Sequence, residues 1–403
     1  MRAASPARAV LVAALLLGGA ALAGCTGGPP PTAGPQSSAP VSPSPDAGSG
    51  DAGTIYASPG GAGDCQAPQT ACALASALGI AEAGTRVELA AGEYGSMDLA
   101  ADDRLAALDP PVVVEAPEGV VASFDRLGLD VPNVTWRGLT VTGVWFVNGP
   151  AEHTRIERAH VDGTGLFVRS KHVTVVDSLL ENGSSVDGIQ IGGAEDVLIE
   201  GNTVRDYDQA KDNGLHADCI QIFDSKQVTI RGNRLSNCYN AGLIISPGRR
   251  EGSDGLLVES NFIQGCVVKT ERCRGGSATD LRELTVKNVT VRNNTFMDGS
   301  VRVDPLEGMV FDRNIVEYIS TCDAPVTNSI IEKWNAKACA VPAVVGRDGN
   351  RTGQVRVADR DAGDLRLTDV SSARITPSGD RTPAATSIEG TPMSPDVAGA
   401  SMG

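Results

Sequence analysis

Two short segments carry the same pattern of side chains that could do chemistry. Asp187-Gly188-Ile189-Gln190-Ile191 is repeated as Asp218-Cys219-Ile220-Gln221-Ile222. The isoleucines have the parity of a buried strand face, so the two glutamines should face outward, one above the other, with the aspartates at the preceding corner. Two carboxylates on adjacent strands would share a proton or hold a cation such as Ca²⁺. A corner that favours Asp, beside a Gln ladder, is the purely structural alternative.

An inserted loop brings further reactive groups to the second segment. The loop spans residues 207–215 and contains Tyr207 and Lys211, and His216 follows it. We expect this loop to form one wall of a groove, although an ordinary polar surface loop would have a similar composition. Such residue types transfer protons to and from a sugar. The candidate catalytic residues are Asp218, His216, Asp187, Lys211 and Tyr207.

Outward polar side chains near the same groove are candidates for substrate binding. Arg302 should lie in the strand column of the two glutamines, and Arg249 lies in a loop of the next coil. An arginine pairs bidentately with a carboxylate and therefore suits recognition of a uronate. The candidate binding residues are Gln190, Gln221, Arg249 and Arg302, and each arginine could instead be a solvated surface residue.

The element that positions these residues is a repeated strand. Apolar and polar residues alternate in segments such as Val197–Asn202, Val228–Asn233 and Val289–Asn294, which indicates strands with one buried face. Five of these strands end in an asparagine at the same place: Asn202, Asn233, Asn261, Asn294 and Asn314. We expect these asparagines to turn a corner in the left-handed conformation and to hydrogen-bond up the stack.

This repeat resembles the right-handed parallel β-helix of the pectate-lyase-like superfamily, over residues 54–375. The resemblance implies an all-β solenoid of about nine or ten coils. It also implies a short capping helix within residues 71–81 and a trailing segment at 376–403. Many members of this superfamily cleave or epimerise acidic polysaccharides, and other members only bind or adhere. The strand His216-Ala217-Asp218-Cys219-Ile220-Gln221 is similar to one in actinobacterial β-helix proteins, a likeness that implies a site but no reaction.

The polygalacturonase family is similar in part. Asp187-Gly188-Ile189 matches one of its motifs, and Asp218-Cys219 matches half of the next. Ala217 stands where that family has its general acid, and Asn240-Ala241-Gly242 lies where the family has Gly-His-Gly. The resemblance therefore does not imply the inverting hydrolysis of that family.

The first residues predict export. A basic start precedes the apolar run 9–23, and the sequence Leu22-Ala23-Gly24-Cys25 resembles a bacterial lipobox, in which the cysteine is lipidated. Residues 1–24 are then a signal peptide, and residues 25–53 are a Pro/Ser/Gly-rich tether. We expect a lipoprotein on the extracellular face of the membrane, and a plain secretory signal is the alternative.

The other eight cysteines agree with an oxidising compartment because they fall in close sequential pairs. No pair has the CxxC spacing of a zinc site, so disulfides are favoured over zinc. The predicted pairs are Cys65–Cys72, Cys219–Cys238, Cys266–Cys273 and Cys322–Cys339.

The composition of the chain limits the classes of molecule that it is expected to bind. The net charge is −15, which disfavours binding to nucleic acid or to an anionic lipid surface, and 41 % apolar residues indicate a folded chain. The sequence predicts a monomeric enzyme that acts on a uronate-containing polysaccharide as a lyase, epimerase or hydrolase. The alternative is a non-catalytic surface protein that binds glycan or cell wall.

Overall fold

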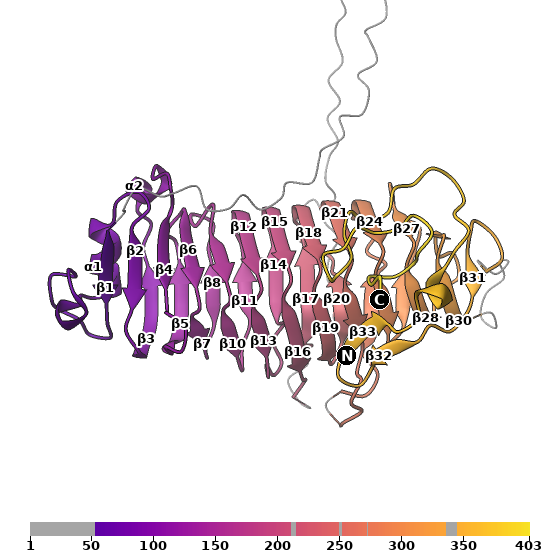
Figure 1. The fold of residues 1–403 in the computed structure, drawn as a ribbon, viewed down its shortest axis with the longest axis horizontal. Helices are drawn as coiled ribbons and strands as arrows, with labels where there is room; N and C mark the ends of the chain where they lie inside the picture. Colours follow the sequence, from indigo (N-terminus) through magenta and orange to yellow (C-terminus); the bar gives the residue numbers. More distant parts are fainter. Residues whose placement is uncertain (1–52, 211–214, 250–251, 272, 336–344) are drawn as a thin grey trace, which may run out of the picture. The chain divides into compact units, whose positions relative to one another are not determined.

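The structure is a computed structural model of the chain, and it describes residues 53–210, 215–249, 252–271, 273–335 and 345–403. Two long parallel sheets form the body, and each strand pairs with strands one coil before and after it (Figure 1). The first sheet has twelve strands in sequence order. They are β1 (Thr54–Ala57), β2 (Arg86–Leu89), β4 (Val112–Glu115), β6 (Val134–Arg137), β9 (Arg155–Glu157), β12 (Lys171–Val176), β15 (Glu195–Glu200), β18 (Lys226–Arg231), β21 (Asp254–Glu259), β24 (Lys287–Arg292), β27 (Val310–Asp312) and β29 (Val326–Thr327).

The second sheet begins with the long strands β3 (Gly92–Leu99) and β5 (Ala122–Leu129) and then divides into two columns. One column contains β8 (Trp145–Val147), β11 (Leu166–Val168), β14 (Ile189–Gly192), β17 (Asp218–Phe223), β20 (Ala241–Ile245), β23 (Ser277–Leu281) and β26 (Val301–Val303). The other contains β7 (Thr140–Val141), β10 (His160–Asp162), β13 (Leu179–Glu181), β16 (Thr203–Tyr207), β19 (Arg234–Cys238), β22 (Phe262–Gln264), β25 (Thr295–Met297), β28 (Ile315–Ile319), β30 (Ile330–Trp334) and β31 (Arg351–Thr352).

This architecture is the parallel β-helix that the repeat predicted, with more coils than expected. The first sheet has twelve strands among the described residues, whereas the spacing predicted nine or ten coils. Only five of these twelve strands, β15, β18, β21, β24 and β27, are followed by the asparagine that marks the repeat, and β4 and β29 are among those that are not. The alternate inward side chains are buried Val, Ile and Leu, so the core runs between the sheets.

The asparagine ladder forms, but the asparagines do not take the left-handed corner conformation. The Nδ2 of each of the first four donates to the Oδ1 of the next ladder asparagine at 2.9–3.1 Å, and all five side chains are buried. The left-handed residue is the one before each: Gly201, Gly232, Ser260, Asn293 and Arg313. The preceding residue turns the chain, and the asparagine is then free to bond along the stack.

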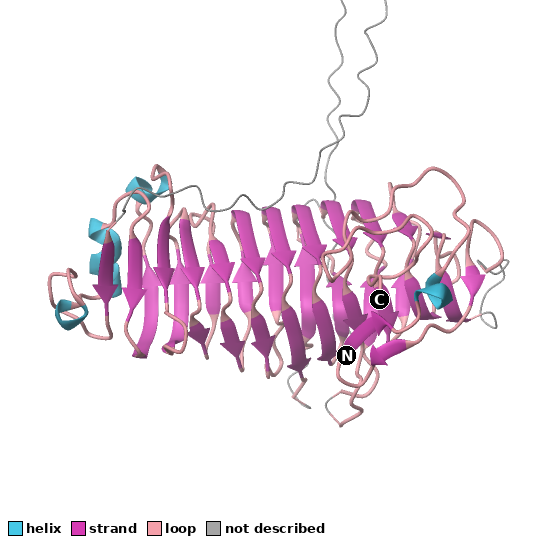
Figure 2. Ribbon diagram, in the orientation of Figure 1, coloured by secondary structure: helices cyan, strands magenta, loops and turns pink. Residues whose placement is uncertain are grey.

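Short helices lie near the ends of the described body (Figure 2). The predicted capping helix is α1 (Leu74–Ile80), which buries Leu74, Ala77 and Leu78. The others are α2 (Asp103–Ala106) and the 3₁₀ turns η1 (Pro68–Thr70) and η3 (Val370–Ala373). None of the helices in the described ranges is long and apolar enough to cross a membrane.

Three of the four predicted disulfides are present, Cys65–Cys72, Cys219–Cys238 and Cys266–Cys273. The fourth, Cys322–Cys339, includes Cys339, which lies outside the described residues. Cys219–Cys238 joins β17 to β19 and therefore crosslinks two successive coils beside the corner that carries Asp218.

The chain after β31 folds back onto the coils. It forms the antiparallel pair β32 (Val357–Asp359) and β33 (Asp364–Leu367). Residues 373–400 then pack on the outward side chains of β22, β25, β28 and β30, namely Phe262, Met297, Ile315 and Ile330. Left-handed corner residues bind this segment: Ser260 donates to Thr386 O, Asn293 accepts from Ala384 N, Arg313 donates to Pro395 O, and Asn328 accepts from Ser378 N.

Candidate active site

The two glutamines of the repeated motif lie side by side on the outer face. β14 and β17 pair with Gln190 opposite Gln221, while the flanking isoleucines are buried. Gln190 Nε2 donates to Gln221 Oε1 at 2.9 Å and to Asp187 Oδ2 at 2.8 Å. Gln221 Nε2 donates to Ser246 Oγ at 3.0 Å. The predicted register is confirmed, and the glutamines link the first corner carboxylate to a loop two coils later.

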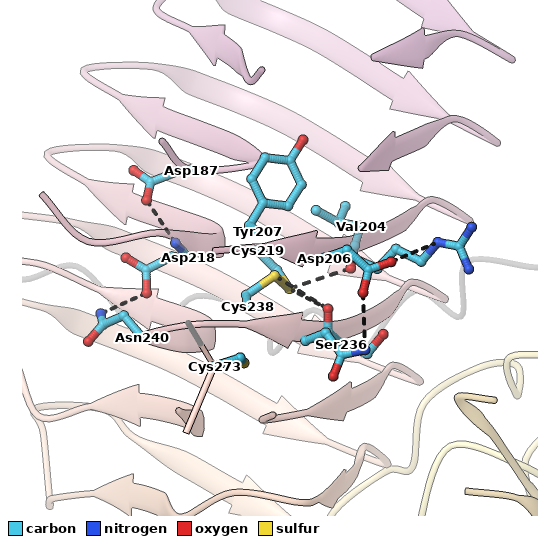
Figure 3. Close-up of a disulfide and its surroundings, with 12 residues drawn as sticks. Asp187, Val204, Asp206, Tyr207, Asp218, Cys219, Ser236, Cys238, Asn240 and Cys273 are labelled. Atoms are coloured by element: carbon cyan, nitrogen blue, oxygen red, sulfur yellow. Dashed lines mark hydrogen bonds and ion pairs between the residues drawn. A yellow bond between two sulfur atoms is a disulfide. The ribbon is translucent and has the colours of Figure 1, made fainter. Parts of the chain in front are cut away.

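Asp187, His216 and Asp218 meet at the corner before these strands. One ligand atom from each residue lies within 4.8 Å of the other two. The backbone N–H of Asp218 donates to Asp187 Oδ1 at 2.9 Å, so the two carboxylates lie one coil apart (Figure 3). Asp218 Oδ2 lies 2.9 Å from His216 Nδ1, and its Oδ1 accepts from Asn240 Nδ2 at 2.8 Å.

Burial differs sharply within this cluster. Asp218 is 0 % exposed and Asp187 is 5 % exposed, whereas 49 % of the His216 side chain is exposed. Because Nδ1 of His216 is held by Asp218, Nε2 is the nitrogen that can reach a substrate. The cluster is therefore a buried carboxylate that orients a half-exposed imidazole, with a second carboxylate beside it.

Burial and the neighbouring charges raise the pKa values of two residues of the cluster, Asp187 and His216. Burial raises the pKa of Asp187 to about 6, and the Asp218 carboxylate adds to this rise. The hydrogen bond to Asp218 raises the pKa of His216, although partial burial opposes the rise. A carboxylic acid whose pKa is raised to about 6 and an imidazole whose pKa is raised by a carboxylate are suited to move protons in opposite directions.

The same three residues could hold a metal ion, but they fit Ca²⁺ poorly. Ca²⁺ takes six to eight oxygen ligands. Here one donor is an imidazole nitrogen, and the carboxylate oxygens already accept from Asp218 N, Gln190 and Asn240. One nitrogen and two carboxylates suit a transition metal better.

A hollow of about 350 Å³ opens beside the cluster. Its walls come from three coils, where two were predicted, and from Leu215 at the end of the inserted loop. It is lined by Phe167, Ser185, Val186, Asp187, Gln190, Leu215, His216 and Gln221. Four of the predicted residues, Asp187, Gln190, His216 and Gln221, thus face one cavity, and Asp218 lies directly behind His216.

One predicted catalytic residue, Tyr207, does not join this group. Tyr207 is 0 % exposed at the end of β16, and its hydroxyl donates to Thr164 O at 2.6 Å. Its ring fills the space left by Gly183, and burial raises the pKa of its hydroxyl far above the usual range. The prediction that Tyr207 faces the groove is therefore wrong, because its position on β16 points inward. Lys211 lies outside the described residues.

The two arginines predicted to bind substrate lie in different places. Arg302 lies in the strand column of Gln190 and Gln221, as expected, but Ile244 and Asp280 stand between them. Its guanidinium lies 3.4 Å from Asp280 Oδ2, so it belongs to a local ion pair and not to the site. Arg249 lies next to the site and lines a second hollow that also contains Gln221.

The sequence analysis missed two residues that bind predicted site residues directly. Arg169 follows β11 and donates to Gln190 O at 2.9 Å, and its second amino group bonds Gln190 Oε1. Asn240 precedes β20 and binds Asp218. The repeat aligns Gln221 of β17 with Gln190 of β14 and with Phe167 of β11. This alignment indicates that polar residues on the coils before and after the two glutamines can reach the site.

Comparison with known proteins agrees with the fold. A sequence profile described as the right handed beta helix region matches residues 142–331. No curated protein matches the chain. Solved structures with a similar fold include pectate lyase Pel9A, with 14 % identity and a TM-score of 0.47 over 86 % of this chain and 95 % of that one. The alginate lyase AlyGC of family PL6 has 13 % identity and a TM-score of 0.38 over 79 % of this chain and 56 % of its own.

The A-module of the Azotobacter vinelandii mannuronan C-5 epimerase AlgE4 has 15 % identity and a TM-score of 0.34, over 64 % of this chain and 82 % of that one. These likenesses are to the fold and transfer no activity. The stacked parallel sheets and the profile match together show that residues 142–331 belong to a right-handed parallel β-helix.

Proposed function

We propose that this protein is an enzyme that moves a proton at C5 of a uronate in an acidic polysaccharide, as a lyase or an epimerase. The observation that carries the proposal is the Asp218–His216 pair, with Asp187 one coil away and the hollow in front of them. A buried carboxylate that fixes the imidazole tautomer is the arrangement that prepares histidine to act as a base.

In the proposed reaction, His216 Nε2 takes the C5 proton of the bound uronate. The electron pair of the C5–H bond forms the C4–C5 double bond as the C4–O4 bond breaks, and the leaving oxygen receives a proton from Asp187. A carboxyl group with a pKa of about 6 is protonated in part of the molecules near neutral pH, as an acid in this role requires. Return of a proton to C5 from the opposite face would give epimerisation instead.

The geometry favours these reactions over hydrolysis. Retaining and inverting glycosidases separate their two carboxyl groups by about 5–5.5 Å and about 6.5–9.5 Å, and both groups reach the substrate. One oxygen of Asp187 lies within 4.8 Å of one oxygen of Asp218, and Asp218 is buried with both of its oxygens bound by Asn240 and His216. Asp218 therefore orients His216 and cannot attack a sugar.

The test is a screen of the purified protein on pectate, alginate and glycosaminoglycans. The unsaturated product absorbs in the ultraviolet, epimerisation incorporates solvent deuterium at C5, and hydrolysis releases reducing ends without either signal. His216→Ala and Asp187→Asn should each lower kcat by about 10²–10⁴. His172→Ala, an exposed histidine of β12, is the matched control and should keep full activity. Binding without turnover on every polymer would instead support a glycan-binding protein.

We also propose that the domain is held at the cell surface through lipidated Cys25, followed by the tether 25–53. The proposal rests on the lipobox-like sequence alone. Cys25→Ser should release the protein into the medium, because a single lipid-modified residue supplies the attachment. A Cys25→Ser variant that stays with the membrane fraction would refute it.

A further inference from the structure

We infer that the second hollow, the one lined by Arg249 and next to the hollow at His216, is a subsite for a second carboxylated sugar. The substrate would then be a run of adjacent uronates. The inference rests on the proposed function, because it specifies which polymer that site would accept. It is carried by the shape, the charge and the anchoring of this second hollow, which has a volume of about 490 Å³.

Three hollows follow one another along the strand direction, and each shares lining residues with the next; we call the three together the trough. The hollow at His216 shares Gln221 with the second hollow. The second shares Gly193 and Asp224 with a third, of about 460 Å³. The outward positions 190 and 192 of β14 lie ~6.6 Å apart, which is the scale of one sugar ring. A chain bound at His216 would therefore continue into the second hollow.

The trough is richer in cations than the protein as a whole. Arg169 and Arg249 line the second hollow with one carboxylate, Asp224. Lys171 and Lys226 line the third hollow together with Glu195 and Asp224. With Asp187 of the first hollow included, the trough has four Lys and Arg side chains against three carboxylates, whereas the whole chain has a net charge of −15. Basic groups gathered in a trough attract an anionic polymer.

The second hollow also has an apolar wall suited to a sugar ring. The ring of Phe223 occupies the space above Gly192, where an added Cβ would lie 2.3 Å from it. The guanidinium of Arg169 lies 5.4 Å from the centre of the same ring. An aromatic ring in the wall of a hollow gives the C–H face of a sugar a surface to pack on, while the arginine offers charge beside it.

Arg249 is the residue that would read the second carboxylate. Its backbone N–H donates to Asp224 Oδ2 at 2.7 Å, and Gly252 N–H donates to Asp224 Oδ1 at 3.1 Å. Asp224 thus fixes the loop through backbone amides. Among the residues that the structure describes, no carboxylate pairs with the Arg249 guanidinium, so it is placed to bind a ligand carboxylate.

The experiment measures binding separately from catalysis. In the His216→Ala background, isothermal titration with oligogalacturonate and oligoguluronate of defined length, and with a chondroitin oligosaccharide, gives Kd for runs of uronate and for an alternating chain. Arg249→Gln should weaken binding of the preferred oligouronate by about 10- to 100-fold, since a charged hydrogen bond is lost. It should leave the weaker binding of the alternating chain unchanged.

Arg302→Gln is the matched control, because it removes an arginine from the same face in a local ion pair, and it should not change Kd. In the active protein, Arg249→Gln should raise KM for the oligouronate with kcat unchanged. Equal Kd with and without Arg249, or equal affinity of the parent for the alternating chain, would overturn the subsite. Arg249-dependent binding without turnover of any uronate by the unsubstituted protein would instead overturn the proposed function and leave the subsite standing.

Discussion

Asp218 is held on both carboxylate oxygens, by Asn240 and by His216, and no part of it reaches solvent. The sequence pattern places Asp218 at a corner outside the core, and from that position alone we expect its replacement to cost little stability. The structure changes that expectation, because removing an acceptor would leave a buried donor without a partner, at a cost of about 1–3 kcal/mol.

The first prediction follows from this pair. Asp218→Asn should lower the pKa of His216, because the hydrogen bond to Asp218 is the largest cause of the rise. An NMR titration of the imidazole measures this directly and needs no substrate. An unchanged His216 pKa in a folded variant would mean that Asp218 does not orient the ring.

The second prediction concerns stability and pH. A carboxyl group whose pKa is raised by folding favours the folded state below its unfolded pKa, and this contribution is lost as pH rises through the folded value. For Asp187 the window runs from 3.8 to about 6, and the loss is about 3 kcal/mol. The raised pKa of His216 extends the decline to higher pH. Urea unfolding at pH 4 and pH 8 should therefore show a smaller decline for Asp187→Asn than for the unsubstituted protein.

At the residue scale, the sequence predicted what repetition reveals. The Asp-x-Ile-Gln-Ile pattern occurs twice, at 187–191 and 218–222, so strand parity predicted that its glutamines share one column and face outward. Arg169 and Asn240 lie on coils before and after that pattern, and no sequence period marks them. Tyr207 was predicted to begin the loop but is the last residue of β16, and its side chain points into the core. The sequence does not mark where the strand ends and the loop begins.

Among the elements, the asparagine ladder holds the corner between successive coils. Asn233 Oδ1 accepts from the backbone and side-chain amides of Asn202 at 2.9 and 3.1 Å. Asn233 Nδ2 donates to Ile199 O and to Asn261 Oδ1 at 2.9 and 3.0 Å. One side chain thus satisfies buried groups on three coils.

The third prediction tests that role. Asn233→Ala should lower the free energy of unfolding by at least about 3 kcal/mol, because several buried polar groups lose a partner and each costs about 1–3 kcal/mol. Asn148→Ala, in a partly exposed turn, should change stability by no more than about 0.5 kcal/mol. Chemical denaturation of both variants gives the comparison, and similar losses would contradict the role of the ladder.

The elements were easier to predict than their corners. Strand parity and the recurring asparagines gave the parallel β-helix and its stacking, since both depend on local alternation. The left-handed position was displaced by one residue, because glycine, serine, asparagine and arginine all occupy it and no single residue type marks it.

For the whole molecule, the segment after β33 is part of the packed structure. It covers apolar side chains on β22, β25, β28 and β30 that would otherwise face water. The resemblance to the β-helix superfamily implied that residues 376–403 are only a trailing segment. Their packing depends on partners more than 80 residues away, which local patterns do not reveal.

The fourth prediction is that deletion of residues 376–403 destabilises the body. Each uncovered Phe, Met or Ile side chain returns to water at a cost of up to roughly 1.5–3 kcal/mol. The truncated protein should unfold at lower temperature and bind a hydrophobic dye, as circular dichroism and dye fluorescence would show. An unchanged melting temperature would mean that this packing contributes nothing.

The contacts between this segment and the corners also bear on how the coils open in time. In a simple solenoid each coil touches only its neighbours, so the ends fray one coil at a time. Here the hydrogen bond from Ser260 to Thr386 spans 126 residues, and similar bonds reach Asn293, Arg313 and Asn328. The amides of β21, β24, β27 and β29 should then exchange with solvent in one concerted event, whereas those of β6, β9 and β12 open progressively. Contacts so distant in sequence also close late, so the last step of folding should be the slow arrival of this segment on coils that already exist.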